Sequence, residues 1–336
     1  MKRIGRQTVN IDTPVYIRET AAIAGIKEGE GPLRDSFDEV LTDDSLGEST
    51  WEKSESALLK KTFFKTIDKA GLTQGDIDYV LAGDLLNQCI GAHYSMRDLD
   101  IPFLGLYGAC STMTESLSIG AMLVGGGFAN NVMCMTSSHF CSAEKQFRNP
   151  LEYGGQRPPS AQWTVTGAGC ALLGTEKGIA RIKSVTSGKV IDKGVTDIAN
   201  MGAAMAPAAA DTLAAHFAAT DTKPSDYDII LTGDLGHIGS DILSELMTRN
   251  GYDLTNIHND CGKLIFDREK QDTHAGGSGC GCCASVLCGH IMSEVKKGNL
   301  KRILVMATGA LMNPLIVQQG ESIPCIAHAV EIEKEG

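Results

Sequence analysis

The chain has 336 residues, of which 43% are hydrophobic, 21% charged and 5% aromatic, and its formal net charge is −11. This composition is typical of a globular protein long enough for two domains. Because the chain is acidic and has no run of Lys or Arg to follow a phosphate backbone, we expect no nucleic-acid partner. The first residues contain no apolar signal-peptide region, and no stretch approaches 18 apolar residues. We therefore expect the chain to fold in the cytosol.

The N-terminal part begins with a pattern of strand, helix and strand. PVYIRETAAIAG, which starts at Pro14, predicts a strand, and Leu59, Phe63 and Ile67 are spaced as one buried face of a helix. An acidic turn and an apolar run, DIDYVLAGDL (residues 76–85), then predict a second, buried strand.

The next feature is a glycine-rich turn that leads into a helix, GLYGACSTMTE (residues 105–115), and places Cys110 at the helix N-terminus. A helix N-terminus carries roughly half a positive charge and unpaired N–H groups, which stabilise a thiolate. Cys110 is therefore a candidate nucleophile, and we expect it at the base of a cavity. Residues 116–139 continue with an apolar helix, a Gly/Asn stop and a strand.

The second half of the chain repeats these features. DYDIILTGDL (residues 226–235) shares six of ten residues with residues 76–85, and the same offset of 150 relates the helix before each strand. Residues 282–310 again read as a helix, a Gly-Asn stop and a strand. We therefore predict two duplicated units, 1–178 and 179–336, with Leu81 and Leu231 on equivalent strands.

Alternating helices and apolar strands define the expected fold class. The pattern predicts an α/β protein whose mixed, mostly parallel sheets are covered by helices on both faces. Ligands of such folds bind at the carboxyl ends of the strands.

The chain has eleven cysteines, which are not spaced as a disulfide framework, so most of them should be buried thiols in a reducing compartment. The cluster from Cys280 to Cys283, with Cys261 and His274 upstream, suggests a metal site. However, it lacks paired C-x-x-C motifs, and small residues at the start of a tightly packed helix explain it equally well. We favour buried thiols and leave the identity of any metal open.

The Gly-Ala-Cys sequence at Cys110 and the Gly-rich segment over residues 276–281 resemble the thiolase fold, and within it ketoacyl synthase III. The resemblance implies a layered αβαβα arrangement and a Cys-His-Asn catalytic set. The positions of the family's histidine and asparagine fall on Gly233 and Gly277, so the set is incomplete. His237, four residues further on, is a less favoured substitute. Loss of one oxyanion donor typically costs about a hundred- to thousand-fold in rate.

A closer resemblance extends over nearly the whole chain. The segments AGDLLNQ (82–88), GACST (108–112), EYGGQRP (152–158), MGAAMAPAAADT (201–212) and QQGESIPCIAHAV (318–330) are similar to those of the stage V sporulation protein AD family. The resemblance implies a noncatalytic protein of sporulation and germination that binds dipicolinic acid, with or without calcium, and supports its uptake into the developing spore.

The same resemblance bears on partners and location. It implies membrane-bound partner proteins encoded in the same operon, and a position on the cytoplasmic side of the forespore or spore inner membrane, held through those partners. Thiolase-fold relatives usually dimerise, so we expect a homodimer. No cofactor is expected, apart from calcium bound with the ligand.

Dipicolinate carries two carboxylates, which must meet donors or a cation when they are buried. Two helix N-termini offer backbone N–H groups, one at residues 110–112, with Cys110 and Ser111, and the other at residues 278–280, with Ser278 and the preceding Gly277. Arg148 could clamp a carboxylate, and an ion pair with a surface acid is an equally good interpretation.

Further candidates lie at predicted strand ends. Asp84, with the neutral oxygens of Asn87 nearby, is the preferred cavity residue, whereas for Asp234 we prefer a helix-capping role. His139 and His328 are candidates too, although a lone histidine is more often a hydrogen-bonded core residue.

Two alternatives to a binding protein remain. The first is an acyltransferase or thioester hydrolase in which Cys110 forms an acyl adduct and His139, His237 or His328 acts as the base. The second is an assembly subunit whose cavity is vestigial. Fold analogy alone does not choose between them.

Overall fold

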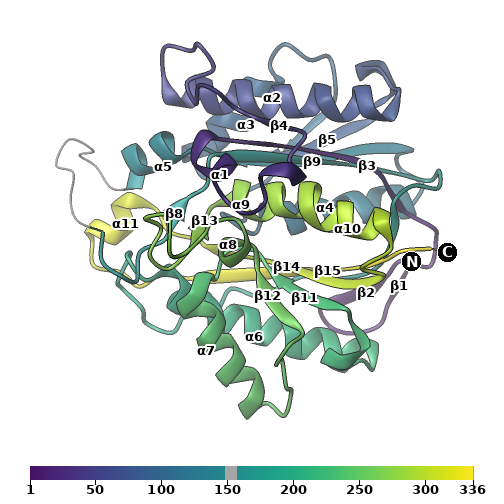
Figure 1. Ribbon diagram of the computed structural model, residues 1–336. Coiled ribbons are helices and arrows are strands. Elements are labelled where there is room, and N and C mark those ends of the chain that lie inside the picture. Colours follow the sequence, from purple (N-terminus) through teal and green to yellow (C-terminus); the bar gives the residue numbers. More distant parts are fainter. Residues whose placement is uncertain (148–156, 336) are drawn as a thin grey trace.

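The computed structural model describes residues 1–147 and 157–335, and its helices and sheets are stacked in layers (Figure 1). Helices α2 and α3 cover one outer face, α6 and α7 cover the other, and α4, α9 and α10 lie between the sheets. This is the layered αβαβα arrangement that was predicted, and the mixed α/β fold class is confirmed.

The bounds up to residue 174 are β1 Lys2–Arg3, β2 Thr8–Asn10, β3 Tyr16–Ala24, α1 Ile26–Gly29, β4 Glu39–Val40, α2 Trp51–Ala70, β5 Tyr79–Gly83, α3 Ile90–Met96, β6 Phe103–Gly105, α4 Thr112–Gly125, β7 Asn131–Ser138, α5 Phe140–Phe147, β8 Trp163–Thr164 and β9 Gly167–Gly174.

The remaining elements follow in the same order of strands and helices. They are β10 Ala180–Thr186, α6 Met201–Thr220, β11 Ile229–Thr232, α7 Gly236–Arg249, β12 His258–Asp260, α8 Cys261–Leu264, β13 Gly277–Ser278, α9 Cys280–Ser285, α10 Met292–Lys297, β14 Arg302–Ala310, α11 Pro314–Gln318 and β15 Cys325–Glu333. A π-helical segment, Val286–Ile291, joins α9 to α10.

The strand order is symmetric about the contact between β3 and β10. Reading outward, one series is β3, β9, β7, β5 and β6, and the other is β10, β15, β14, β11 and β12. The two series join only where Tyr16 pairs with Arg181 and Ile17 pairs with Ala180. Leu81 lies on β5 and Leu231 on β11, the fourth strand of each series, as the repeat predicted.

One detail of the predicted sheets is wrong: parallel pairing does not dominate. The outer pairs are parallel, whereas β9 runs antiparallel to β3 and β7, and β15 runs antiparallel to β10 and β14. The connection from β14 to β15 contains only the short helix α11 and no crossover helix on the sheet face. A parallel return would need such a crossover, so β15 runs back alongside β14.

Helices α2 and α6 bury the residues that the periodicity placed on their inner faces. Leu59 and Phe63 of α2, and Leu213 and Phe217 of α6, are at most 1% exposed. Both helices end in the left-handed region, α2 at Gly71 and α6 at the residue 150 positions later. The spacing of the buried residues and the left-handed residue at the C-terminus therefore recur in α6 at positions 150 residues after those in α2.

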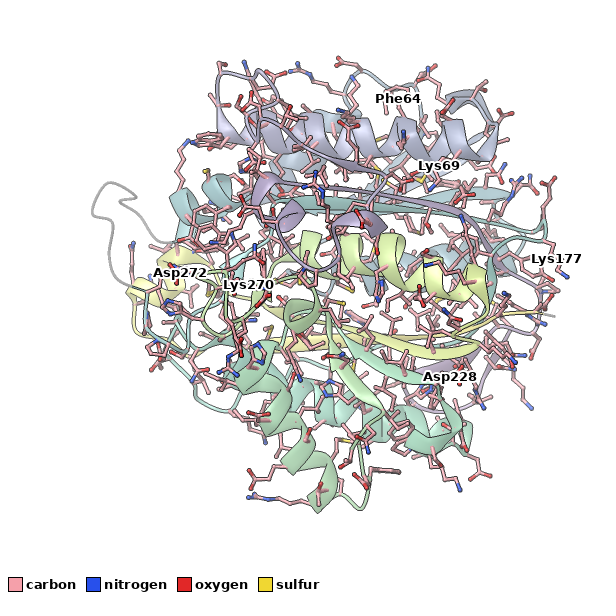
Figure 2. All side chains as sticks on the ribbon, in the orientation of Figure 1. Phe64, Lys69, Lys177, Asp228, Lys270 and Asp272 are labelled. Atoms are coloured by element: carbon pink, nitrogen blue, oxygen red, sulfur yellow. The ribbon has the colours of Figure 1, made fainter. Side chains whose placement is uncertain are left out.

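A carboxylate at the start of each equivalent strand repeats the same contact. Asp78 accepts N–H bonds from Asn130 and Asn131, which lead into β7, at 2.6 and 2.9 Å. Asp228 accepts them from Lys301 and Arg302, which lead into β14, also at 2.6 and 2.9 Å (Figure 2). These bonds hold the start of β7 next to its parallel neighbour β5, and the start of β14 next to its parallel neighbour β11.

In the part of the chain that the structure describes, no helix has both the length and the apolar character needed to cross a lipid bilayer.

Candidate functional site

A cavity lies at the carboxyl ends of the strands, between the first and second halves of the chain. It is lined by the turn before α4, by α5, by β8 and β13, and by the segments that follow β5 and β14, and its volume is about 40 Å³. A space of that size holds only a few water molecules. The lining residues are Leu85, Tyr107, Ala109, Cys110, Ala143, Glu144, Phe147, Thr164, Ile198, Met201, Ser278, Ala310 and Met312.

Cys110 lies where the sequence placed it, two residues before α4 and on the cavity wall. The preceding Ala109 has a φ of 48°, in the left-handed region that residues with a side chain rarely adopt. The prediction of a cysteine at a helix N-terminus beside a cavity is confirmed. The strained backbone at Ala109 turns the chain sharply enough to point the thiol at the cavity.

The carboxylate that contacts Cys110 is Asp234, from the loop after β11. Its Oδ1 accepts a hydrogen bond from Thr308 Oγ1 at 2.8 Å. Its Oδ2 accepts from Ser278 Oγ at 3.0 Å and from the backbone N–H of Gly279 at 3.1 Å. Asp234 is completely buried, so these donors replace the water it would otherwise bind.

The electrostatics of Cys110 disfavour a thiolate. Burial raises the pKa of the Cys110 thiol well above its ordinary value, and the charge of Asp234 and the nearby Cys280 act in the same direction. Burial also raises the pKa of Asp234, although its hydrogen-bond donors oppose that shift. The helix N-terminus, which would favour the thiolate, is therefore outweighed.

Asp84 and Asp234 reverse the roles that sequence reasoning preferred. Asp84 lies outside the cavity lining, and its two carboxylate oxygens accept backbone N–H bonds from Leu86 and Ala92 at 2.8 and 2.7 Å. It therefore caps the turn that follows β5, and burial raises its pKa to about 6. Asp234, for which capping was preferred, faces Cys110.

Asp260 explains why Asp234 is free to face the cavity. In the second half, Asp260 at the end of β12 accepts the N–H bonds of Leu235 and Gly236 at 2.8 and 2.9 Å. These are the amides at the start of α7, so the capping role is already filled. In the first half, Asp84, directly after β5, accepts the equivalent backbone N–H bonds itself.

If Gly233 and Gly277 replaced the family's histidine and asparagine, the space those side chains vacate would be expected beside Cys110, and that expectation is wrong. A side chain at Gly233 would meet Ala307 at 2.9 Å, and one at Gly277 would meet Ile265 at 3.0 Å. Neither direction leads to Cys110. In the strand β13 successive side chains point to opposite sides, so Ser278, and not Gly277, lines the cavity with Cys110. Asp234, in the bend after β11, accepts a hydrogen bond from Ser278.

The two predicted histidines are core residues outside the cavity lining. His139 Nε2 lies 2.9 Å from the backbone oxygen of Asp44, and His139 Nδ1 accepts from the Cys141 N–H. His328 Nδ1 accepts from the Gly188 N–H at 3.2 Å. Burial lowers the pKa of both rings, to about 4 for His328. The structure places neither ring against Cys110.

The other predicted ligand residues are dispersed. Ser278 lines the cavity, whereas Ser111 donates to the backbone oxygen of Gly108 at 2.6 Å and is not part of the lining. Asn87 is exposed, and its N–H donates to Gln146. Arg148 lies outside the described residues. Of the nine predicted ligand residues, the structure therefore brings Cys110 and Ser278 together on the cavity wall.

Several cavity residues were missed by sequence reasoning. Thr164 faces the cavity from β8, which pairs in parallel with β13 and its Ser278. Tyr107 lies within the glycine-rich turn of residues 105–115, and its only sequence signal is an aromatic side chain next to Gly108. Thr308, which lies outside the cavity lining, carries no local signal, because its role depends on Asp234 in the loop after β11.

Metal binding finds no support among the residues that the structure describes, where no group of three or more His, Cys, Asp or Glu side chains could hold an ion. The cysteines from Cys280 to Cys283 are fully buried and free. They pack in the core, which is the interpretation that the sequence favoured.

The layered fold and the cysteine at the α4 N-terminus define a thiolase-like protein. Human mitochondrial 3-ketoacyl-CoA thiolase aligns over 98% of this chain and 100% of its own, with a TM-score of 0.60 and 12% identity. The 3-oxoacyl-(acyl carrier protein) synthase III of Xanthomonas oryzae pv. oryzae aligns over 95% and 98%, with a TM-score of 0.58 and 13% identity. At such identities the likeness shows the fold alone.

Sequence similarity narrows the class further. The model of the family described as stage V sporulation protein AD matches residues 5–333. Stage V sporulation protein AD of Bacillus subtilis (strain 168) is 45% identical over 336 residues, which are 100% of this chain and 99% of that protein. This chain belongs to the stage V sporulation protein AD family, as the sequence resemblance indicated.

Proposed function

We propose that this protein is a noncatalytic binding protein of sporulation that takes up dipicolinic acid in the cavity at Cys110, with or without calcium, and supports its passage into the developing spore. Membership of the stage V sporulation protein AD family supports the sporulation context. The proposal goes further by assigning a ligand and a site.

The observation that carries the noncatalytic part is the position of Asp234, which accepts a hydrogen bond from Ser278, and Ser278 shares the cavity wall with Cys110. A condensing or acyl-transfer site needs a thiolate, a base that removes the thiol proton, and donors for the thioester oxygen. Here the thiol faces a carboxylate, and burial disfavours its ionisation. Histidines 139 and 328, two of the bases considered, are bonded elsewhere in the core.

The walls of the cavity suit one compact aromatic molecule. Apolar and aromatic side chains such as Phe147 and Met312 can pack on a pyridine ring, and Thr164 and Ser278 offer hydroxyl groups. A pyridine dicarboxylate is larger than the few water molecules that about 40 Å³ would hold. Binding therefore requires lining side chains to move, and Tyr107, which is 44% exposed, is free to do so.

Charge sets a second requirement. Glu144 lines the cavity and Asp234 lies against Cys110, so a dianion entering the cavity meets carboxylates. A calcium ion carried by the ligand would balance that charge. We therefore expect calcium to strengthen the binding of dipicolinate.

We also propose that the protein acts at the cytoplasmic side of the forespore or spore inner membrane, as a homodimer, through membrane-bound proteins of the same operon. Family membership supports the sporulation context of this part, and the homodimer follows the expectation for the thiolase fold.

Calorimetric titration with dipicolinate, with and without calcium, tests the ligand. We expect saturable binding to one site per chain, and much weaker binding of isophthalate, which has the two carboxylates but no ring nitrogen. Absence of dipicolinate binding under both conditions contradicts the proposal.

The acyltransferase or thioester hydrolase alternative is favoured by one observation, the cysteine retained at the α4 N-terminus. Incubation with acyl-CoA followed by intact mass measurement separates the two functions. An acyl adduct that disappears in Cys110→Ala, with release of free CoA, would establish the enzyme. We expect neither.

A further inference from the structure

Three donors converge on the carboxylate of Asp234 from two different segments. They are the hydroxyl of Ser278 on β13, the N–H of Gly279 and the hydroxyl of Thr308 on β14, at 2.8 to 3.1 Å. The thiol of Cys110 is a fourth neighbour: it lines the same cavity wall as Ser278, and burial together with the charge of Asp234 raises its pKa. The chain has thus built a donor set of the kind that binds an anion, and its own carboxylate fills it.

We infer that Asp234 silences Cys110: its carboxylate occupies the donor set beside the thiol and holds Cys110 as a neutral hydrogen-bond donor. Asp234 is in this sense a positioning residue, because it acts through Cys110 and not on a ligand directly. The inference concerns the cavity of the proposed function and deepens its noncatalytic character. Its test uses no dipicolinate, so the silencing of Cys110 and the binding of dipicolinate can each fail without the other.

Two consequences follow from the geometry. A thioester oxygen that approached Cys110 would find the hydroxyl groups of Ser278 and Thr308 already directed at Asp234. A proton leaving the thiol would place a negative charge next to the buried carboxyl of Asp234, which makes the thiolate less favourable. The same carboxylate therefore removes both the oxyanion donors and the nucleophile.

The surroundings add no opposing charge within the described residues. The titratable groups that influence Cys110 or Asp234 are thiols, a phenol and a carboxyl, namely Cys280, Tyr107, Asp260, Cys282 and Cys325. All of them become neutral or negative, so none could stabilise a thiolate. The one favourable contact of that kind comes from the backbone N–H of Gly279.

The test measures how fast the Cys110 thiol reacts with methyl methanethiosulfonate as a function of pH, read by peptide mass spectrometry. In this reaction the thiolate attacks the sulfenyl sulfur and methanesulfinate leaves, so the rate follows the thiolate fraction. We expect Asp234→Asn to raise the rate at pH 8 by at least about tenfold, the effect of one unit of pKa. Cys141, a partly exposed thiol elsewhere, is the internal control and should not change.

A second variant separates charge from structure. Asp234→Ala should show the same faster reaction, and added formate, which can refill the donor set, should slow it again. Formamide has a similar size but no charge and should not slow it. Asp84→Asn removes a carboxyl at the equivalent strand end that has no contact with the thiol, and should leave the Cys110 rate unchanged.

Equal rates in Asp234→Asn and the unmodified protein would overturn the inference, as would a formamide effect equal to that of formate. If Asp234→Asn does not fold, Asp234→Ala decides: an equal Cys110 rate with and without formate would sink the idea.

Discussion

Ser278 Oγ donates a hydrogen bond to Asp234 Oδ2 at 3.0 Å. This bond joins β13 to the loop after β11, next to Cys110. Ser278 also lines the cavity. One hydroxyl therefore belongs both to the wall that a ligand would touch and to the donors that hold the buried carboxylate.

Removing that hydroxyl tests its share in ligand binding. We expect Ser278→Ala to weaken dipicolinate binding roughly three- to tenfold, since a hydrogen bond contributes about 0.5–1.5 kcal/mol. Calorimetry measures the change. Ser285→Ala is the matched control, because that hydroxyl bonds to the Gly281 backbone oxygen away from the cavity lining. Equal affinity in both variants would place the ligand elsewhere.

Filling the cavity is a second test. Ala143 on α5 is 4% exposed and lines the cavity, so Ala143→Leu places three extra carbon atoms in the space that the ligand needs. We expect dipicolinate affinity to fall more than about tenfold, while overpacking costs about 1–3 kcal/mol of stability. Ala57→Leu on α2, outside the cavity lining, should bind normally. Unchanged affinity in Ala143→Leu would exclude this cavity.

The pH dependence of stability should reflect Glu28, which is completely buried. Burial raises its pKa from 4.5 to about 8. Between these pH values the unfolded chain loses the proton and the folded chain keeps it, so stability falls as pH rises. The shift corresponds to roughly 3–5 kcal/mol.

Glu28→Gln should reduce that fall, because the amide carries no proton to lose, and the remaining fall comes from other buried carboxyls such as Asp84 and Asp260. Thermal unfolding at pH 5 and pH 8.5 compares the two proteins, and the exposed Glu30→Gln is the control. If Glu28→Gln and the unmodified protein lose the same stability over this range, the buried carboxyl does not titrate as described.

Gly309 on β14 tests how closely the Cys110 turn is held. A side-chain carbon there would lie 2.1 Å from the backbone oxygen of Gly108. Gly309→Ala must therefore push away the turn that carries Cys110, and we expect a loss of about 1–3 kcal/mol in stability together with weaker ligand binding. Gly75→Ala, where a side chain meets only Thr73 at 3.7 Å, should change little in either measurement.

The sequence by itself determined the features that depend on local pattern. The 150-residue repeat placed Leu81 and Leu231 on equivalent strands, because apolar runs and acidic turns specify strand and stop within a short segment. The glycine-rich turn placed Cys110 at the start of α4 for the same reason. Both depend on neighbours in the chain, which can be read directly.

Only the tertiary structure decided which side chains meet at the cavity. Asp234 and Ser278 hydrogen-bond to each other beside Cys110, each one residue beyond Gly233 and Gly277, which the resemblance places at the positions of the family's histidine and asparagine. For Ser278 on β13 the reason is that one residue of register turns a strand side chain to the opposite side. Asp234 is free to bond there because Asp260, from a different strand, caps α7 in its place. Such a division of roles depends on contacts between distant segments, which no local pattern encodes.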